Sequence, residues 1–573
     1  MSGTQADAWL VVIEFLRVQT FLFSVRRLRE MVGANVQLGE MVREQLPKLA
    51  VEHGAYCPPG GEALILPGAD ATDPLSASKS PDDPRGLVAR GILGRDGGRL
   101  SALFPDEGRA LAFSRAARDT LQQALPGLLF TIHPARDLAG GEAEDQVSGE
   151  VAVQTLVELP VFQVCQVSGN GPASALQPAQ DRNEEPRWVG RAAKERRARA
   201  GAFFGRQPTH DIIGLLQDAI PLSGCKAAED FETLCGPYRR LGGANGESAA
   251  GDYLAVIHAD GNGIGKRFQA WRRDQAPRFS LGWCNEARHE LFFHPMRVAV
   301  RRAVLAGLQV FAGCDAPFRP YQLLMLGGDD LLLVCRAQYA LDFVVEYARA
   351  LEKSQLADGQ PLSVGVGVVI AAPTFPFHYL HHLAEALAGS AKMKQRALGQ
   401  EVSVVDWMVT TYSWSDDPVA MRRRDALVRY QTAAGAETLI LSEKPYTVLD
   451  GDAGPGLAAL LQDARDVAAV GDEGGRVARS QLRRLVDTLP LGRGLAQLRL
   501  GEMPEVARRS LGRARHLAQG KALPWRGLAA AEGEGAVWSS ALADLVEVYE
   551  IAHLGGYSAR GEEAQRGVEV GDA

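Results

Sequence analysis

At 573 residues the chain is too long for a single hydrophobic core, so we expect roughly two to four domains. Its 46% hydrophobic and 23% charged residues are typical of a globular protein, and no run of about 18 uncharged apolar residues predicts a membrane span. The net charge of −7 excludes a general attraction to nucleic acid, so any contact with a polyanion must be local. We therefore expect a cytoplasmic protein.

The first 160 residues alternate between strands and helices. An apolar strand from Leu10 to Phe15 precedes a helix whose apolar positions, from Leu28 to Met41, recur at helical spacing. From Pro67 to about Leu100, Pro, Ser, Asp and Gly dominate, which predicts an exposed insertion or long loop. The segments "EGRALAFSRAARDTLQQAL" and "GLLFTIHP" then predict a helix and a strand. Residues 1–160 are therefore predicted to form a small α+β domain.

A polar region at 161–250 is predicted to link this domain to the next one. Its basic stretch, Arg187 to Arg206, carries seven Arg or Lys residues against one Glu. A solvated helix or linker is the plainer interpretation, and contact with RNA or an acidic partner subunit is the alternative.

Residues 251–412 are predicted to form a second α+β domain with the order βαββαβ, which is that of a ferredoxin-like palm. Its predicted elements are a strand at 253–259, a helix at 284–310, a hairpin at 321–335, a helix at 338–356, a strand at 362–372, a helix at 377–396 and a strand at 401–407. Helical patterning dominates the remainder, so 413–573 is predicted to be a helical C-terminal domain.

The hairpin "YQLLMLGGDDLLLVC" places two aspartates between apolar runs. In a βαββαβ sheet the end of the first strand meets this turn, so Asp260, Asp329 and Asp330 would come together. Such carboxylates raise one another's pKa values unless a cation neutralises them, and oxygen ligands select Mg²⁺ or Mn²⁺. A simple hairpin turn would also use Gly and Asp. The glycine-rich "ADGNGIGK", which ends the first strand, favours a metal and phosphate site instead.

The ordered set "LAVIHADGNGIGKRF", "MLGGDDLLLV" and "LSVGVGVVIAAPTFPFHYLHHLAEALAGSAK" resembles the second palm domain of the large subunit of type III CRISPR effector complexes, the Cas-ten family. The segment "RVQTFLFSVRRLREMVGANVQLGEMV" resembles the start of that family's first, degenerate palm. The likeness covers most of residues 10–410 in order. It implies an α+β fold with two ferredoxin-like, nucleotide cyclase-like palm domains and a helical C-terminal domain.

The resemblance also implies an activity, a nucleotidyl cyclase that joins ATP molecules into cyclic oligoadenylate second messengers in antiviral defence. Asp260, Asp329 and Asp330 would be catalytic and would hold two Mg²⁺ or Mn²⁺ ions, with the Gly261 carbonyl as a further ligand. Lys392 in "GSAK" matches a lysine that contacts triphosphate, and Lys394 is a near alternative. The predicted nucleotide-binding residues are Gly261, Asn262, Gly263, Gly265, Lys266, Gly327, Gly328 and Lys392. Other effector subunits and guide or target RNA are the implied partners.

The sequence departs from the family pattern in two places. The chain begins almost directly at the first palm, and its one HD dipeptide, His210–Asp211, lacks the other ligands of a nuclease. Cys165 stands where a four-cysteine zinc module would begin, but Ser168 takes the place of the second cysteine. We therefore expect no HD nuclease domain and a degenerate zinc module.

Two other functions remain open, and one further cluster needs an interpretation. A diguanylate cyclase would carry GGDEF or GGEEF rather than "GGDDLL", and a catalytically silent subunit would bind nucleotide or RNA without turnover. His378, His381 and His382 share one predicted helix. Without acidic partners, they predict a surface or near-substrate role rather than metal binding.

Overall fold

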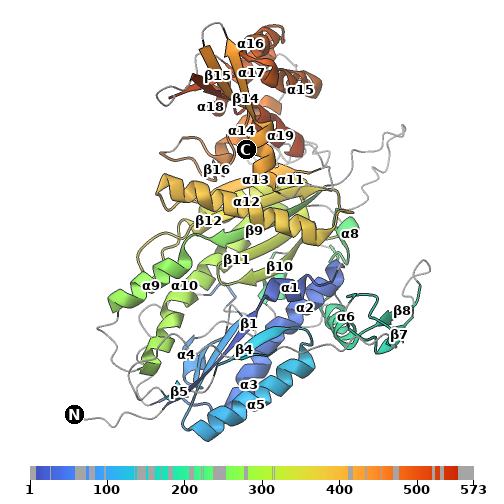
Figure 1. Ribbon diagram of the computed structural model, residues 1–573, viewed down its shortest axis with the longest axis vertical. Helices are drawn as coiled ribbons and strands as arrows, with labels where there is room; N and C mark the ends of the chain where they lie inside the picture. Colours follow the sequence, from blue (N-terminus) through green and yellow to red (C-terminus); the bar gives the residue numbers. More distant parts are fainter. Residues whose placement is uncertain are drawn as a thin grey trace, which may run out of the picture.

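Two six-stranded sheets, each with helices packed against it, form the lower and central parts of the molecule in Figure 1, and a four-stranded sheet lies among the C-terminal helices. The computed structural model describes residues 8–25, 27–58, 73–75, 84–95, 98–133, 136–137, 150–152, 162–169, 171–178, 185–204, 212–220, 222, 225–235, 253–275, 282–312, 314, 317–410, 417–432, 435–452, 454–468, 477–518, 523–529 and 535–552.

The first sheet belongs to the N-terminal part of the chain. Its strand order is β2-β3-β1-β4-β6, with β5 also paired to β1. The strands are β1 (Trp9–Leu16), β2 (Ile92–Gly94), β3 (Arg99–Phe104), β4 (Leu129–Ile132), β5 (Arg136–Asp137) and β6 (Glu150–Ala152). The helices are α1 (Val18–Leu22), α2 (Leu28–Glu40), the π-helix η1 (Met41–Gln45), α3 (Leu46–Glu52), α4 (Pro84–Val88) and α5 (Glu107–Ala124).

The predicted N-terminal elements are confirmed, but the predicted insertion is wrong over its second half. Helix α5 begins after Asp106, whose side chain accepts a hydrogen bond from the Arg109 amide as an N-cap does. The segment predicted as an exposed loop contains α4 and β2, and its apolar residues Val88 and Ile92 are fully buried. Its glycines and charged residues obscured these short apolar elements in the sequence pattern.

The described residues of the middle region form a two-stranded hairpin and three helices. These elements are β7 (Ala175–Gln177), β8 (Arg187–Val189), α6 (Arg191–Phe204), α7 (Ile212–Asp218) and α8 (Phe231–Cys235).

The basic stretch supplies β8 and α6, and α6 packs on α2. Arg197 pairs with the buried Glu30 at 3.2 Å, and Arg199 pairs with Glu40. The guanidinium of Arg196 lies over the Phe21 ring, 4.3 Å from its centroid. These arginines are engaged within the chain, so the stretch offers RNA less positive charge than the sequence predicts.

The second sheet has the predicted βαββαβ connectivity. Its strands, in spatial order, are β10 (Tyr321–Gly327), β11 (Asp330–Arg336), β9 (Leu254–Gly261), β12 (Val364–Ala371), β13 (Val404–Val409) and β16 (Tyr446–Thr447). Its helices are α9 (Ile264–Gln275), α10 (Gly282–Leu308) with the short η4 (Gln309–Phe311), α11 (Ala337–Leu351) and α12 (Phe377–Leu398). Helix α9, which follows the glycine-rich turn at once, was not predicted.

The central strand β9 divides the core because successive side chains of a strand point to opposite faces. Ala255 and Ile257 pack in the apolar cluster that contains α10 and α11. Leu254 and Val256 pack in a second cluster with α12, and this cluster also includes β1 and α2 of the first domain. By the same alternation His258 and Asp260 lie on the α12 face. The two palm-like sheets therefore share one continuous core.

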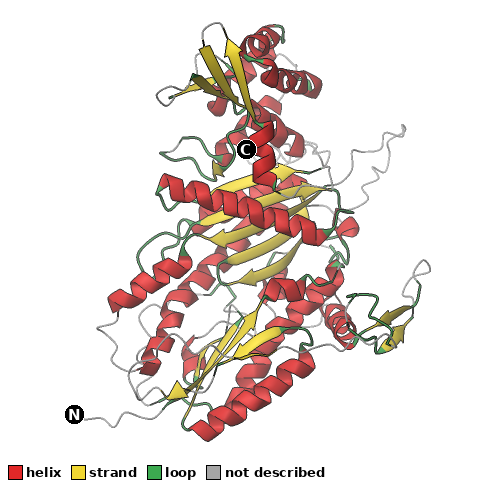
Figure 2. Ribbon diagram, viewed as in Figure 1, coloured by secondary structure: helices red, strands yellow, loops and turns green. Residues whose placement is uncertain are grey.

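The C-terminal part is mostly helical, as predicted, but it also holds a four-stranded sheet that the sequence analysis missed (Figure 2). Its helices are α13 (Pro418–Asp425), α14 (Leu457–Ala468), α15 (Arg479–Thr488), η5 (Leu489–Leu491), α16 (Arg493–Gly501), α17 (Glu505–Arg513), α18 (Arg515–Ala518) and α19 (Leu542–Ala552). Its strands are β14 (Leu427–Thr432), β15 (Gly435–Ile440), β18 (Ala536–Ser539) and β17 (Arg526–Leu528). None of the described helices is both long enough and apolar enough to cross a membrane. The domain boundaries proposed at 160, 250 and 412 stay a prediction.

Candidate functional site

The "GGDD" segment forms the turn between β10 and β11. Gly327 pairs with Asp330, so Gly328 and Asp329 are the two loop residues. Gly328 has a φ of 62°. A type II′ turn requires a positive φ at the first of its two loop residues, and glycine adopts this conformation most easily. The turn therefore presents Asp329 at its tip and Asp330 as the first residue of β11.

Strand register brings the third aspartate to the same place. Strands β9 and β11 are antiparallel neighbours, with Ala259 opposite Leu331, so Asp260 at the end of β9 adjoins Asp330. The carboxyl groups of Asp260 and Asp330 are hydrogen-bonded to each other. The Gly261 N–H donates to Asp329. A Cβ on Gly261 would lie 2.6 Å from Asp329 Oδ2, which explains the glycine.

Without a bound cation, burial and the mutual repulsion of the carboxylates favour the protonated forms of Asp329 and Asp330. Burial, together with the charges of Asp260 and Asp329, raises the pKa of Asp330 to about 8. Burial and the Asp260 charge also raise the pKa of Asp329. An Asp330 with this pKa retains its proton at neutral pH, which is what allows it to hydrogen-bond to Asp260.

A lysine from α12 supplies the opposing charge. Lys392 forms an ion pair with Asp260. Gly365 of β12 lies beside Asp260 in register, and a Cβ there would lie 2.5 Å from Lys392 Cγ, so glycine lets the lysine stem pass. The alternative, Lys394, lines a separate small cavity with Glu443. The structure thus brings Lys392 to the aspartates and does not bring Lys394.

The glycine-rich turn after Asp260 leads directly into α9, whose first residue is Ile264. Gly263, Gly265 and Lys266 are exposed beside the aspartates, and Gly263 has a φ of 64°. Backbone N–H groups at a helix N-terminus favour anions, so this turn suits phosphate.

Asn262, a member of the predicted nucleotide-binding set, is engaged within the chain. Its side chain is buried and donates to Ser363 Oγ at 3.0 Å, while its backbone N–H donates to the Ser363 carbonyl at 2.9 Å. These bonds hold the turn to the start of β12. The side chain therefore has a structural role.

A cavity of about 490 Å³ opens next to the turn, between the first domain and the edge of the second sheet. Its second-domain lining includes Met325, Gly327 and Asp330, and Arg17 and Asn35 lie in the opposite wall. In Figure 1, α1 and α2 lie against the β10 edge. The volume is within the usual range of about 300–1,000 Å³ for small-molecule sites.

Sequence reasoning missed the first-domain residues of this cavity. Arg17 has a φ of 50°, which is uncommon for a residue with a side chain and recurs at ligand sites. The signal was present in "RVQTF", which resembles the family's first palm, but that resemblance assigned no role to its arginine.

The remaining predicted features lie elsewhere. His210 and Asp211 are outside the described residues. Cys165 is buried beside the β7–β8 hairpin. Burial alone would raise the pKa of Cys165, but hydrogen bonds from Ser168 and nearby backbone amides lower it overall. Ser168, the residue at the second-cysteine position, therefore contacts the Cys165 thiol directly.

The connectivity, the strand-end aspartates and the helix-borne lysine together have the arrangement of a palm domain. Residues 253–398 match the family described as Cas10/Cmr2, second palm domain. This segment is a second palm domain of the Cas10/Cmr2 family, and the resemblance seen in the sequence is confirmed. None of the curated proteins matches the sequence significantly.

Solved structures give weaker likenesses. Csm1 in T. onnurineus is 11% identical, with a TM-score of 0.45 over 95% of this chain and 70% of that chain. The Csm1–Csm4 cassette in complex with cA4 is 12% identical, with a TM-score of 0.43 over 96% of this chain and 70% of that chain. The cassette in complex with AMPPNP is 14% identical, with a TM-score of 0.34 over 70% of this chain and 54% of that chain. Because these TM-scores are low, the likenesses add nothing on activity or partners.

Proposed function

We propose that this protein is a metal-dependent nucleotidyl cyclase that joins ATP into cyclic oligoadenylates as part of a cytoplasmic type III CRISPR effector complex. The observation that carries the proposal is the hydrogen-bonded pair of Asp260 and Asp330 on adjacent strand ends of a Cas10/Cmr2 second palm domain. A structural turn has no need of two half-buried acids that share a proton, because their mutual repulsion and desolvation are unfavourable.

The residues fit a Mg²⁺ or Mn²⁺ site. Asp260, Asp329 and Asp330 offer carboxylate oxygens, and the Gly261 carbonyl is a further oxygen donor, which is the ligand type that both ions prefer. The raised pKa of Asp330 marks a place where a cation would replace a proton. A bound ion would lower the pKa of an attacking ribose hydroxyl and stabilise charge on departing pyrophosphate.

Residues around the aspartates would hold and orient the nucleotide. Lys392, which forms an ion pair with Asp260, would turn to a triphosphate. The backbone N–H groups at Gly263 and Gly265, with Lys266 beside them, would receive phosphate oxygens at the start of α9. The cavity beside Asp330 is large enough for the nucleoside, and Arg17 provides a cation in its far wall.

The direct test is product formation. The purified protein, alone and with type III effector subunits and target RNA, is incubated with ATP or GTP and Mg²⁺ or Mn²⁺, and products are identified by mass spectrometry. Asp260→Ala and the double variant Asp329→Ala with Asp330→Ala should each reduce cyclic oligoadenylate by about a hundredfold or more, since this is the effect of removing one electrostatic stabiliser from an active site.

Asp425→Ala is the matched control, because Asp425 is an exposed aspartate in α13 that pairs only locally with Arg424. It should retain the parental rate. Cyclic dinucleotide from GTP would favour the diguanylate cyclase alternative. Absence of product under every condition would favour the silent nucleotide-binding subunit and contradict the proposal.

A further inference from the structure

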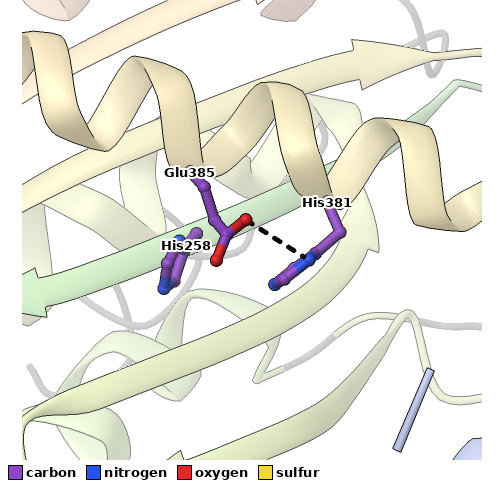
Figure 3. A group of neighbouring side chains, drawn as sticks. All are labelled: His258, His381 and Glu385. Carbon is purple, nitrogen blue, oxygen red and sulfur yellow. Dashed lines mark ion pairs between the residues drawn. The ribbon is translucent and has the colours of Figure 1, made fainter. Parts of the chain in front are cut away.

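A second cluster of potential ligands lies on the same face of the second sheet as Asp260. His258 projects from β9, and His381 and Glu385 project from α12 toward it (Figure 3). Each of the three offers a ligand atom, and these atoms lie within 4.8 Å of one another. Among the described residues, no other group of three or more His, Cys, Asp or Glu side chains meets that condition.

This cluster corrects the interpretation drawn from the sequence. His378 and His382 are exposed, so the three histidines of α12 do not form one group. The acidic partner that was not recognised in the sequence is Glu385, one turn after His381, and the second imidazole comes from a strand more than a hundred residues earlier.

The histidines are buried with unsatisfied nitrogens. His258 is 6% exposed, and neither of its ring nitrogens has a hydrogen-bond partner. His381 is 7% exposed, and its Nε2 likewise has none. Burying such groups without partners is unfavourable, and the few that occur in native proteins often mark an ion or water. His258 therefore indicates a ligand in this position.

The separations suit ligands of one ion better than direct hydrogen bonds. His381 Nδ1 and Glu385 Oε2 are 3.9 Å apart, which is too long for a hydrogen bond. In a tetrahedral zinc site, two ligands with bonds of about 2.0–2.2 Å stand roughly 3.3–3.6 Å apart, so the separation of His381 and Glu385 exceeds this by only a few tenths of an ångström. Because the Glu385 side chain is 39% exposed, it can rotate to close the remaining gap.

The surroundings favour neutral imidazole. Burial lowers the pKa of His381 to about 4, and His258 and His382 add to that effect. The Phe23 ring lies 4.9 Å from the His381 ring and the Phe377 ring stacks on it at 6.3 Å, so aromatic rings pack against His381. Neutral imidazole is the form that binds metal.

A glycine makes the cluster possible. Gly367 of β12 lies beside His258 in register, and a Cβ there would lie 2.0 Å from the Ala384 carbonyl oxygen. Glycine at this position lets α12 pack close to the sheet, so that His381 and Glu385 reach His258.

We propose that His258, His381 and Glu385 bind one zinc-class divalent ion that fastens α12 to β9 beside the aspartate site. Two imidazoles and one carboxylate favour Zn²⁺ over Mg²⁺ and Mn²⁺, which prefer oxygen ligands throughout. Water completes the coordination on the exposed side of Glu385. The role is structural, because the ion holds the helix that carries Lys392.

The test measures metal content and does not depend on catalysis. The full-length protein is stripped with chelator, loaded with Zn²⁺ in the presence of excess Mg²⁺, dialysed and analysed by elemental mass spectrometry and thermal melting. We expect one zinc per chain and a higher Tm with Zn²⁺ that Mg²⁺ does not reproduce. Co²⁺ loading should give the visible absorption of a low-symmetry nitrogen and oxygen site.

Glu385→Gln and His381→Gln should lose this zinc and the zinc-dependent part of the Tm. Glu385→Gln changes a half-exposed residue to its isostere, so it tests binding even if His381→Gln fails to fold. His382→Gln, an exposed neighbour on the same helix, should keep the zinc, as should the Asp329→Ala, Asp330→Ala double variant. A zinc content far below one per chain, or equal zinc in the parent and in Glu385→Gln, would overturn the proposal.

Discussion

The ionisation of Asp330 is determined by its burial and by the acids beside it. In the folded protein burial and two neighbouring acids raise the pKa of Asp330 from 3.8 to about 8, whereas in the unfolded chain it returns to its ordinary value. The folded state therefore binds a proton that the unfolded state releases between these pH values. Stability must then fall as pH rises through the window, because the unfolded state binds fewer protons there.

This argument predicts the pH dependence of the metal-free protein. In chelator, the Tm should decrease from pH 5.5 to pH 8.5, and Asp330→Asn should remove part of that decrease by abolishing the titration. Added Mg²⁺ should restore most of the loss at pH 8.5 in the parent and little in the variant. Melts of Asp342→Asn, which removes a half-buried carboxylate paired with Arg465, control for general charge effects. Identical pH slopes for the parent and Asp330→Asn would refute the assigned pKa.

The positions of individual residues could be predicted from the sequence where they depend only on the local pattern and on the order of strands in the sheet. The three aspartates could be placed because each follows or begins an apolar strand whose neighbour the βαββαβ order fixes. Lys392 and Lys394 could not be separated, since that choice depends on the rotation of α12: two residues apart on a helix is about 200° of turn, so only one of the two can face Asp260. His258 and Glu385 were missed because only tertiary packing brings them together.

Helix α12 depends on two glycines of β12 for its position. At Gly365 and Gly367 an added Cβ would meet Lys392 Cγ and the Ala384 carbonyl oxygen, at 2.5 and 2.0 Å respectively. A flexible lysine stem can move, but a helix carbonyl cannot move without the helix. Gly367 is therefore the stricter requirement.

Gly367→Ala should destabilise the protein by about 1–3 kcal/mol, the usual cost of overpacking a core, and should separate α12 from the sheet. Gly389→Ala is the matched control, because nothing lies within 4 Å of a Cβ at that position in α12. It should stabilise by about 0.5–1 kcal/mol through lower chain entropy. Urea unfolding compares the two. Equal midpoints for Gly367→Ala and the parent would show that α12 is not held as closely as described.

Elements with a strong pattern were predicted almost to the residue, and weakly patterned ones were not. Helix α12 and strand β12 are long and apolar on the faces that pack, so their period identified them. Strand β14 is exposed or half-buried along its whole length, so no buried face marked it in the sequence. The short α4 and β2 contain buried apolar residues but are too brief to show a period.

In the whole molecule, the two palm-like sheets share a core and enclose the cavity beside Asp330. A nucleotide in that cavity would contact both domains. ATP with Mg²⁺ should therefore raise the Tm more than Mg²⁺ alone, with a stabilisation of about 2.7 kcal/mol at a hundredfold excess over its Kd. Arg17→Gly should reduce this ATP-dependent shift.

The same substitution should leave the ligand-free protein about as stable as the parent, because glycine adopts the φ of 50° at Arg17 without strain. Lys48→Ala, which removes an exposed cation of α3, is the control and should keep the full shift. Differential scanning calorimetry with a nonhydrolysable ATP analogue measures both quantities. An undiminished shift in Arg17→Gly would place the nucleotide outside the cavity.

Helix α12 carries Lys392 in its second half, with Glu385 about two turns and His381 about three turns earlier, the latter about 16 Å along its axis. Because a helix is stiff, an ion that holds α12 at His381 and Glu385 also limits the movement of Lys392. Linkage then imposes a symmetry: whatever factor zinc contributes to the affinity for triphosphate, triphosphate must contribute to the affinity for zinc. The position of α12 therefore couples the two sites, so that the affinity at each site depends on whether the other is occupied.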